Sequence, residues 1–286
     1  MFTSIPFKYD NELLREVNLR GLSYNTFKNY RSHLRRISEY FHKDIVDVSI
    51  DDIKTYLSHL KKILRQNPQT VNLCRAAFLF FRQCICGDNL SRLNVPHLKV
   101  VHTFPDLLSV EDILLIFSHI SLRYRAILSL CYGSGLRISE ALDLDISDID
   151  SKKMKVYVKN GKGGKSRYTI LSYYSLNCLR KYWLAFRPPG SKLFPKQNSP
   201  NEAKASQNVG KAFNDTYHKL FPNSNKRITI HTLRHCFSTH LLDSGADLRT
   251  IQLLLGHKSI KTTSLYLQLT DFHFSQLVSP VDKGRM

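Results

Sequence analysis

Four side chains that can act on a phosphate ester lie close together near the carboxyl end of the chain. His231 and Arg234 are three residues apart, which places them on one face of a helix. Gly256 follows an apolar helical run and predicts a helix end, with His257 directly after it. Tyr266 follows at the end of another helical stretch. Two imidazoles, a guanidinium and a phenol suit a phosphate better than a metal ion or a carbonyl group.

Several of these residues also have an ordinary explanation. His231 and His235 are four residues apart and could be zinc ligands, but Thr232 replaces the glutamate of an H-E-x-x-H motif and no third ligand is evident. We therefore expect no metal ion. His235 and His240 are interpreted as ordinary helix residues. A single tyrosine after a helix is more often a packing residue than a nucleophile.

Two further candidates lie upstream, in segments that contain turn residues. Arg137 belongs to the segment GLRISE, and it could form a surface ion pair with Glu140 three residues on. Lys162 lies in the turn NGKGG between two alternating stretches, 155–158 and 166–171, which predict a β-hairpin. The planar guanidinium of an arginine suits two phosphate oxygens better than a lysine would.

The letters GKGGKS in this turn also resemble the end of a P-loop. Gly161 and Gly164 are three positions apart, whereas that motif needs five. The segment also falls between two predicted strands rather than before a helix. We therefore expect no nucleotide binding at this turn.

The segments HTLRHCFSTHLL and LLGHKSIKTTSLY resemble the C-terminal signature of the tyrosine recombinase (phage integrase) family. That family also has an arginine near a GLRxSE segment and a lysine in a β-turn upstream, and this chain matches both positions. The resemblance covers residues 107–266 and is weaker before them. It implies six catalytic residues, the last of them the nucleophile: Arg137, Lys162, His231, Arg234, His257 and Tyr266. Lys165 is a weaker alternative to Lys162 as the catalytic lysine.

The resemblance implies a site-specific DNA recombinase that cleaves and rejoins strands through a 3′-phosphotyrosine intermediate, in integration, excision or dimer resolution. It implies no cofactor, metal or ATP. Its partners would be double-stranded DNA at a specific recombination site and further copies of the chain in a homotetramer, in which a second recombinase could also take part. The layout is most similar to compact Xer-type recombinases and to those of mobile elements. DNA relaxation by a type IB topoisomerase-like activity and a catalytically silent DNA-binding module are the alternatives.

The composition agrees with a nucleic-acid partner. The 286-residue chain has a formal net charge of +19 and a pI near 9.7, which argues for a polyanionic partner over a protein that is merely basic. Six cysteines without a C-x-x-C pair are expected to be reduced thiols of an intracellular protein. The sequence lacks an apolar run long enough to span a membrane and a secretory signal, so the protein is expected to be soluble and cytoplasmic.

Two domains are expected to position these residues, and the fold is expected to be mainly α with a small antiparallel β-sheet. Residues 1–98 are expected to form a helical bundle, which the resemblance makes the core-binding domain that grips DNA. Residues 99–107 are expected to be a linker, and residues 108–286 the α+β catalytic domain. The resemblance implies that a tail at 267–286 packs on a neighbouring protomer, and packing within one chain stays open.

Within the first domain, apolar residues recur at three- and four-residue steps from Tyr24 to Phe41 and predict one buried helix face. Ser49 and Asp52 predict a capping box, and an almost entirely apolar helix at 69–85 is expected to be central. The other face of the helix at 24–41 carries four candidate phosphate contacts, Lys28, Arg31, Arg35 and Arg36. Lys165, at the hairpin turn, is a fifth candidate.

The second domain carries its only tryptophan, Trp183, on a helix expected at 173–186, and we expect this side chain to pack in the core. Residues 187–203 are rich in Pro, Asn and Ser and are expected to be an irregular connection. A further helix is expected at 206–220, leading to the segment that contains His231.

Overall fold

The computed structural model describes residues 7–89, 94–100, 105–159, 166–196, 199–203, 206–257, 259 and 263–264. Lys162, Lys165, Tyr266 and the tail at 267–286 lie outside these described residues. The chain divides into two compact units, residues 1–103 and residues 104–286, and each is described by itself. The division falls within the segment 99–107, for which the sequence predicts a linker.

The first unit is a bundle of α-helices, and side-chain caps explain where most of them begin. The Ser23 hydroxyl accepts a hydrogen bond from the Thr26 amide, and Ser49 with Asp52 forms the predicted capping box. Asn67 caps the last helix, ahead of a proline that needs no amide partner. The elements are α1 (Asp10–Leu19), α2 (Tyr24–Phe41), the 3-10 helix η1 (Ile45–Asp47), α3 (Ile50–Lys62) and α4 (Pro68–Cys84).

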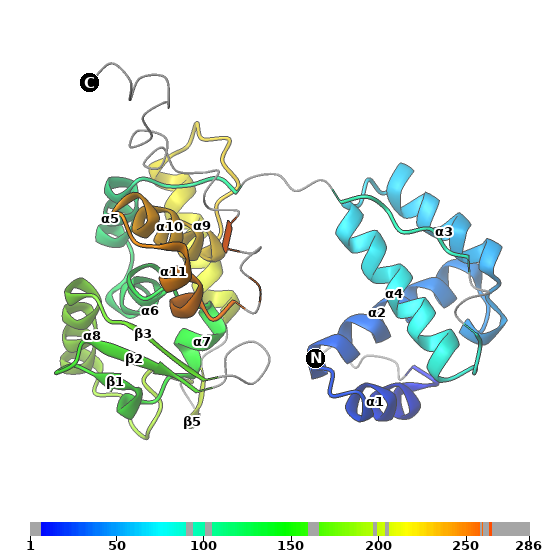
Figure 1. The fold of residues 1–286 in the computed structure, drawn as a ribbon, viewed down its shortest axis with the longest axis horizontal. Helices are drawn as coiled ribbons and strands as arrows, with labels where there is room; N and C mark the ends of the chain where they lie inside the picture. The colour runs from blue at the N-terminus through cyan, green and yellow to red at the C-terminus, as the bar shows by residue number, and fades with distance from the viewer. Residues whose placement is uncertain are drawn as a thin grey trace, which may run out of the picture. The chain divides into compact units, whose positions relative to one another are not determined.

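Helix α4 is the centre of this unit, as its apolar sequence predicts. It packs against both α2 and α3 (Figure 1). Its residues Cys74, Phe78 and Phe81 are fully buried, and burial of each phenylalanine side chain stabilises the fold by roughly 1.5–3 kcal/mol. The prediction that Tyr24 is buried was wrong, because Tyr24 is 59% exposed. It is the first residue of α2, and its ring stacks on Phe27 at the surface of the bundle.

The second unit combines helices with a small antiparallel sheet of order β1-β2-β3, in which Val158 of β2 pairs with Arg167 of β3. The predicted fold class, mainly α with a small antiparallel β-sheet, is therefore confirmed. The elements are α5 (Val110–His119), α6 (Leu122–Gly133), α7 (Ile138–Asp143), η3 (Ile146–Asp148), β1 (Ile149–Asp150), β2 (Lys155–Val158), β3 (Arg167–Ile170), α8 (Tyr173–Phe186), β4 (Pro195–Lys196), β5 (Ser199–Ala203), α9 (Ser206–Leu220), α10 (Ile230–Asp243) and α11 (Leu248–Leu255).

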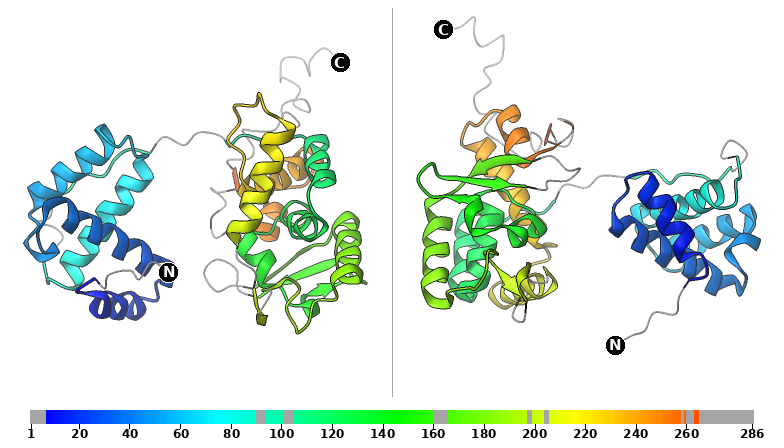
Figure 2. Two further views of the ribbon diagram at one scale, coloured as in Figure 1. Left: turned by 180° about the vertical axis from the view of Figure 1, so that it is seen from behind. Right: turned by 90° about the horizontal axis from the view of Figure 1, so that it is seen from below.

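Helix α6 forms the middle of this unit, with residues 126–131 all buried. It packs against α8 and α10, and α11 packs against strand β3 (Figures 1 and 2). Because α7 follows α6 closely, the short connection between them, residues 134–137, is held against the core. This arrangement brings the end of α6, the strand β3, the helix α10 and the end of α11 to one place.

Two predictions for the second unit were wrong. Trp183 is 37% exposed, whereas its neighbour Tyr182 is 1% exposed and takes the core position. Successive helix residues are turned by about 100°, so only one of these two rings can face the core. The connection predicted as irregular at 187–203 contains the short antiparallel hairpin β4–β5.

All six cysteines are free thiols, as predicted. Cys74 is buried in the first unit, and Cys131, Cys178 and Cys236 are buried in the second. The Cys236 sulfur accepts a hydrogen bond from the Leu108 amide at 3.3 Å. Of the helices that the structure describes, none combines the length and the apolar character that a membrane crossing requires.

Candidate active site

Arg137 stands at the N-terminus of α7, directly after a turn that only glycine fits. Gly135 has a φ of +63°, and a Cβ there would lie 2.5 Å from the Phe237 ring. The Arg137 amide donates to Glu140 Oε2 at 2.9 Å, and its Nη1 donates to Glu140 Oε1 at 2.7 Å. The Glu140 side chain is only 5% exposed, so this pair is not the surface ion pair that the sequence left open.

Arg234 lies on α10 and is 1% exposed. Its Nη1 donates to the Gly135 carbonyl at 2.5 Å and its Nη2 donates to the Leu255 carbonyl at 2.6 Å. Its Nη1 is also 3.7 Å from Glu140 Oε2. A buried guanidinium needs such partners, because removing its hydration otherwise costs several kcal/mol. Arg234 therefore joins α10 to the turn before α7 and to the end of α11.

His257 follows the end of α11, where Gly256 takes the left-handed conformation that the sequence predicts for a helix stop. Its Nδ1 lies 3.0 Å from the Thr263 hydroxyl, and Gln252 Nε2 donates to its carbonyl at 3.0 Å. Burial, followed by the nearby positive charges of Arg234, Arg137 and Arg167, lowers the pKa of His257 to about 4. The imidazole is therefore neutral near pH 7.

His231 lies in the first turn of α10 and is exposed. Its ring meets the ring of His235 edge to face, with 4.6 Å between the centroids. Burial lowers the pKa of His235 to about 4, and the charges of His231 and Arg234 act in the same direction. His235 is thus more than the ordinary helix residue that the sequence suggested, because it supports the ring of His231. Among the residues that the structure describes, no group of three or more His, Cys, Asp or Glu could hold a metal ion.

Two residues of the site were not predicted from the sequence. Glu140 was considered only as a surface partner of Arg137, and Arg167 was not identified. Arg167 donates from Nη1 and Nη2 to the two carboxylate oxygens of Glu140, at 3.0 and 2.8 Å. Burial alone would raise the pKa of Glu140, but the hydrogen bonds and charge of Arg167, followed by those of Arg137, lower it to about 2. A signal was available, since Arg167 is on the same strand face as the buried Thr169.

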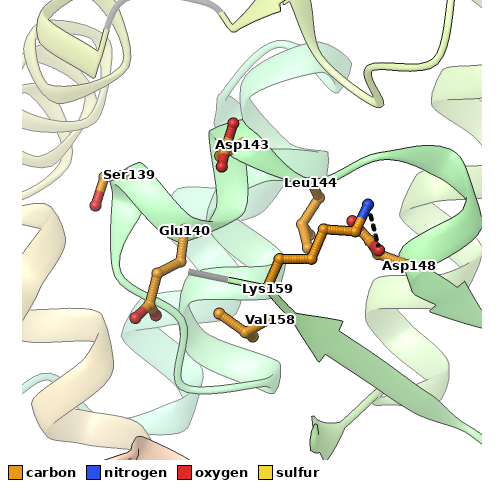
Figure 3. A pocket seen from close by; sticks show the side chains of 7 residues that line it. All are labelled: Ser139, Glu140, Asp143, Leu144, Asp148, Val158 and Lys159. Carbon is orange, nitrogen blue, oxygen red and sulfur yellow. Dashed lines mark ion pairs between the residues drawn. The ribbon is translucent and has the colours of Figure 1, made fainter. Parts of the chain in front are cut away.

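The far side of Glu140 borders a cavity of about 250 Å³, shown in Figure 3. Lys159 lines it and pairs with Asp145 at 2.6 Å and with Asp148 at 3.0 Å. In Figure 3 the Lys159 ammonium points toward Asp148, and the Glu140 carboxylate points away from both. Glu140 is therefore left to the three arginines, Arg137, Arg167 and Arg234, which we call the arginine cluster.

The structure brings four of the six predicted catalytic residues into or beside this cluster. Arg137 and Arg234 share Glu140, His257 lies near all three guanidiniums, and His231 is on the same helix as Arg234. The other two, Lys162 and Tyr266, are outside the described residues.

The predicted phosphate contacts lie in the first unit, apart from Lys165, which is outside the described residues. Arg31 forms an ion pair with Asp10 at 2.6 Å, and its side chain is 22% exposed. Arg35 pairs with Glu39 at 2.9 Å on the same helix. Lys28 and Arg36 are exposed, and the Lys28 ammonium lies over the Tyr24 ring. The basic face of α2 is therefore partly neutralised by its own neighbours.

Comparison with known proteins assigns both units to domains of phage integrases. Residues 106–273 match the model of the phage integrase family, and residues 11–92 match a phage integrase N-terminal SAM-like domain. Tyrosine recombinase XerD of Corynebacterium glutamicum is 31% identical over 88% of this chain and 90% of its own length. Tyrosine recombinase XerA of Thermococcus kodakarensis is 31% identical over 92% and 93%. The fold is similar to that of the site-specific recombinase XerH bound to its difH substrate, with a TM-score of 0.71, 21% identity and coverage of 93% of this chain and 86% of that one.

Proposed function

The chain belongs to the phage integrase family of tyrosine recombinases, and on that premise we propose that it cuts and rejoins DNA through a covalent link to Tyr266. Site-specific DNA recombination is the function that this family membership assigns. One observation carries the chemistry proposed here: two guanidiniums, Arg137 and Arg234, share one buried carboxylate beside a neutral imidazole. This arrangement suits a phosphodiester, which carries one negative charge and gains more as it is attacked.

Arg137 and Arg234 would bind the non-bridging oxygens and stabilise the charge that grows on them. Preorganised donors of this kind are usually the largest catalytic term, and the loss of one costs about 10²–10³-fold in rate. Glu140 holds the cluster without neutralising it, because one carboxylate faces three guanidiniums. When the Thr263 hydroxyl donates to His257 Nδ1, the proton of the imidazole is on Nε2, from which His257 can donate to a phosphate oxygen.

Tyr266 Oη would attack the phosphorus, and its proton would pass to His231, which is exposed and therefore accessible. A new bond forms between phosphorus and the tyrosine oxygen, while the bond to the 5′-oxygen breaks. Lys162 would give a proton to that departing oxygen, with Lys165 as the alternative lysine. The products are a 3′-phosphotyrosine and a free 5′-hydroxyl. Because the phosphodiester energy is kept in the new link, a 5′-hydroxyl from a partner strand can reverse the step without ATP.

The two units would then have different tasks. Residues 1–98 would grip the duplex, with Lys28 and Arg36 as exposed phosphate contacts, and residues 99–107 would link them to the catalytic domain at 108–286. Exchange between two duplexes needs four active sites, so we propose a homotetramer on DNA at a specific site, with the tail at 267–286 packed on a neighbouring copy. The place of action would be the compartment that holds the DNA, the cytoplasm of a cell without a nucleus.

The nucleophile is tested with a nicked suicide duplex, whose sequence is first selected by the protein from a random-sequence library. The protein should form a covalent adduct that survives denaturation, because the nicked strand fragment diffuses away and cannot rejoin. Tyr266→Phe should bind the duplex and form no adduct, since it lacks the attacking oxygen. Tyr173→Phe is the matched control, because Tyr173 is 81% exposed on α8 and should leave the adduct unchanged. An adduct with Tyr266→Phe would place the nucleophile elsewhere.

A further inference from the structure

Arg167 is an arginine to which the proposed chemistry gives no direct role, yet it is almost as buried as Arg234. Its side chain is 8% exposed and touches two other elements from its place at the start of β3. Two of its nitrogens hold the Glu140 carboxylate on α7, and its Nε donates to the Leu254 carbonyl near the end of α11, at 2.8 Å. One side chain therefore joins β3, α7 and α11.

The stem of Arg167 also lies flat against the backbone that precedes His257. A Cβ added to Gly256 would lie 2.8 Å from Arg167 Cδ and 3.2 Å from its Nε. The missing side chain at Gly256 thus makes room for Arg167, and Arg167 in turn limits where the residue after Gly256 can sit. This contact connects the arginine cluster to the backbone that directly precedes His257.

The three arginines contact the Glu140 carboxylate in different ways. Arg137 binds Glu140 Oε1 with its Nη1 and Oε2 with its backbone amide, and Arg234 is 3.7 Å from Oε2, while Arg167 binds both oxygens with one planar guanidinium. A fork of two parallel bonds fixes the plane of the carboxylate, which a single bond or a lysine ammonium cannot do. If that plane turns, the oxygens that orient Arg137 and Arg234 move with it.

We infer that Arg167 is a positioning residue for DNA strand cleavage, which acts through Glu140 on the two phosphate-binding arginines and through the end of α11 on His257. The inference rests on the proposed function, because it assigns Arg167 a part in that same reaction. Arg167 itself does not touch the phosphate. Its removal should therefore slow the chemical step and leave the affinity for DNA nearly unchanged.

The test compares Arg167→Lys and Arg167→Ala with Arg180→Lys, a matched control at an exposed arginine of α8. DNA affinity and single-turnover cleavage of the suicide duplex are measured at saturating protein, well below the melting temperature of each variant. Arg167→Lys should keep its affinity within about threefold and cleave about 10²-fold more slowly, since a single ammonium cannot fix the carboxylate plane. Cleavage by Arg180→Lys should stay within about threefold of the natural chain.

A double-mutant cycle with Glu140→Gln identifies the path, with each variant assayed below its own melting temperature. If Arg167 acts through Glu140, the double variant Arg167→Lys/Glu140→Gln should be about as slow as the slower single variant, and the two losses should not multiply. Multiplying losses, or normal cleavage by Arg167→Lys, would overturn the inference. If Arg167→Ala does not fold, the cleavage rate of Arg167→Lys alone tests the inference. Absence of an adduct from the natural chain would instead refute the proposed function, so the two failures can be told apart.

Discussion

Glu140 is the residue around which the site is built, since Arg137, Arg167 and Arg234 all approach its two oxygens. These partners lower the pKa of Glu140 to about 2, so its carboxylate is ionised near neutral pH. Because one carboxylate faces three guanidiniums, the arginine cluster keeps a net positive charge, which favours an anionic phosphate.

At the residue scale we expect stability to fall on acidification, beginning near pH 6.5. His235 and His257 have pKa values lowered from 6.5 to about 4 by burial and nearby cations. Between pH 6.5 and 4 these two imidazoles bind protons in the unfolded chain but not in the folded chain. The stability present above pH 6.5 is therefore lost as the pH falls toward 4. Glu140, with its pKa lowered from 4.5 to about 2, extends the loss below pH 4.5, because it must be protonated on unfolding.

Urea unfolding at pH 7, 5.5 and 4.5 without DNA measures this dependence. The free energy of unfolding should decrease at each step. His257→Gln is the control, since it cannot titrate and should remove part of the decrease between pH 6.5 and 4. A free energy that stays constant from pH 7 to 5 would contradict the expectation.

At the scale of elements, the turn between α6 and α7 is the part of the fold that sets Arg137 in place. Gly135→Ala should destabilise the protein by about 1–3 kcal/mol, because the new methyl group meets the Phe237 ring and the backbone is left-handed. It should also slow cleavage, since Arg137 follows two residues later. Gly210→Ala on α9 is the matched control: its Cβ would lie 3.7 Å from Ile230, so the change should be neutral or stabilising by up to about 1 kcal/mol.

Thermal and urea unfolding of the two variants, with cleavage measured beside them, checks this prediction. Equal stability of Gly135→Ala and Gly210→Ala would mean that the turn adapts to a side chain and does not hold Arg137.

Elements with local signals could be predicted from the sequence, and those that depend on distant partners could not. The capping box of Ser49 and Asp52 and the stop at Gly256 act within a few residues, so their patterns are sufficient. Arg167 forms its bonds with residues 27 and 87 positions away, so the strand alternation can place it on the face of Thr169 but cannot identify its partners. Trp183 was misplaced for a related reason: the periodicity shows that α8 has a buried face, but neighbours from other elements decide which ring fills it.

The same distinction applies to the candidate site. Residue types and spacing brought out His231, Arg234 and His257, and the resemblance to the family added Arg137. The structure places all four in or beside the arginine cluster. Their spacing could not show that Glu140 is buried or that it is shared. Burial depends on α10 and β3, which are remote in sequence from α7.

At the scale of the whole molecule, the net charge of +19 predicts that DNA binding weakens steeply with salt. Arg36→Ala should reduce the slope of log affinity against log salt by about 1, because an exposed arginine that neutralises one phosphate releases about one counterion. Arg31→Ala is the contrasting variant, since Arg31 is paired with Asp10 and should change the slope less.

Fluorescence anisotropy with a labelled duplex at several salt concentrations gives both slopes. Equal slopes for the natural chain and Arg36→Ala would remove Arg36 from the DNA contacts. A larger change for Arg31→Ala than for Arg36→Ala would mean that the pair with Asp10 opens on DNA.

Each unit contains buried cysteines whose alkylation rate reports how often that unit opens. Cys74 is enclosed in the first unit, and Cys131 and Cys236 are enclosed in the second, so an alkylating reagent can reach each sulfur only after its surroundings open. Cys236 in addition must release the Leu108 amide before it reacts. Mass spectrometry of the alkylated peptides would therefore measure the opening rate of each unit separately, with natural cysteines and no engineered ones.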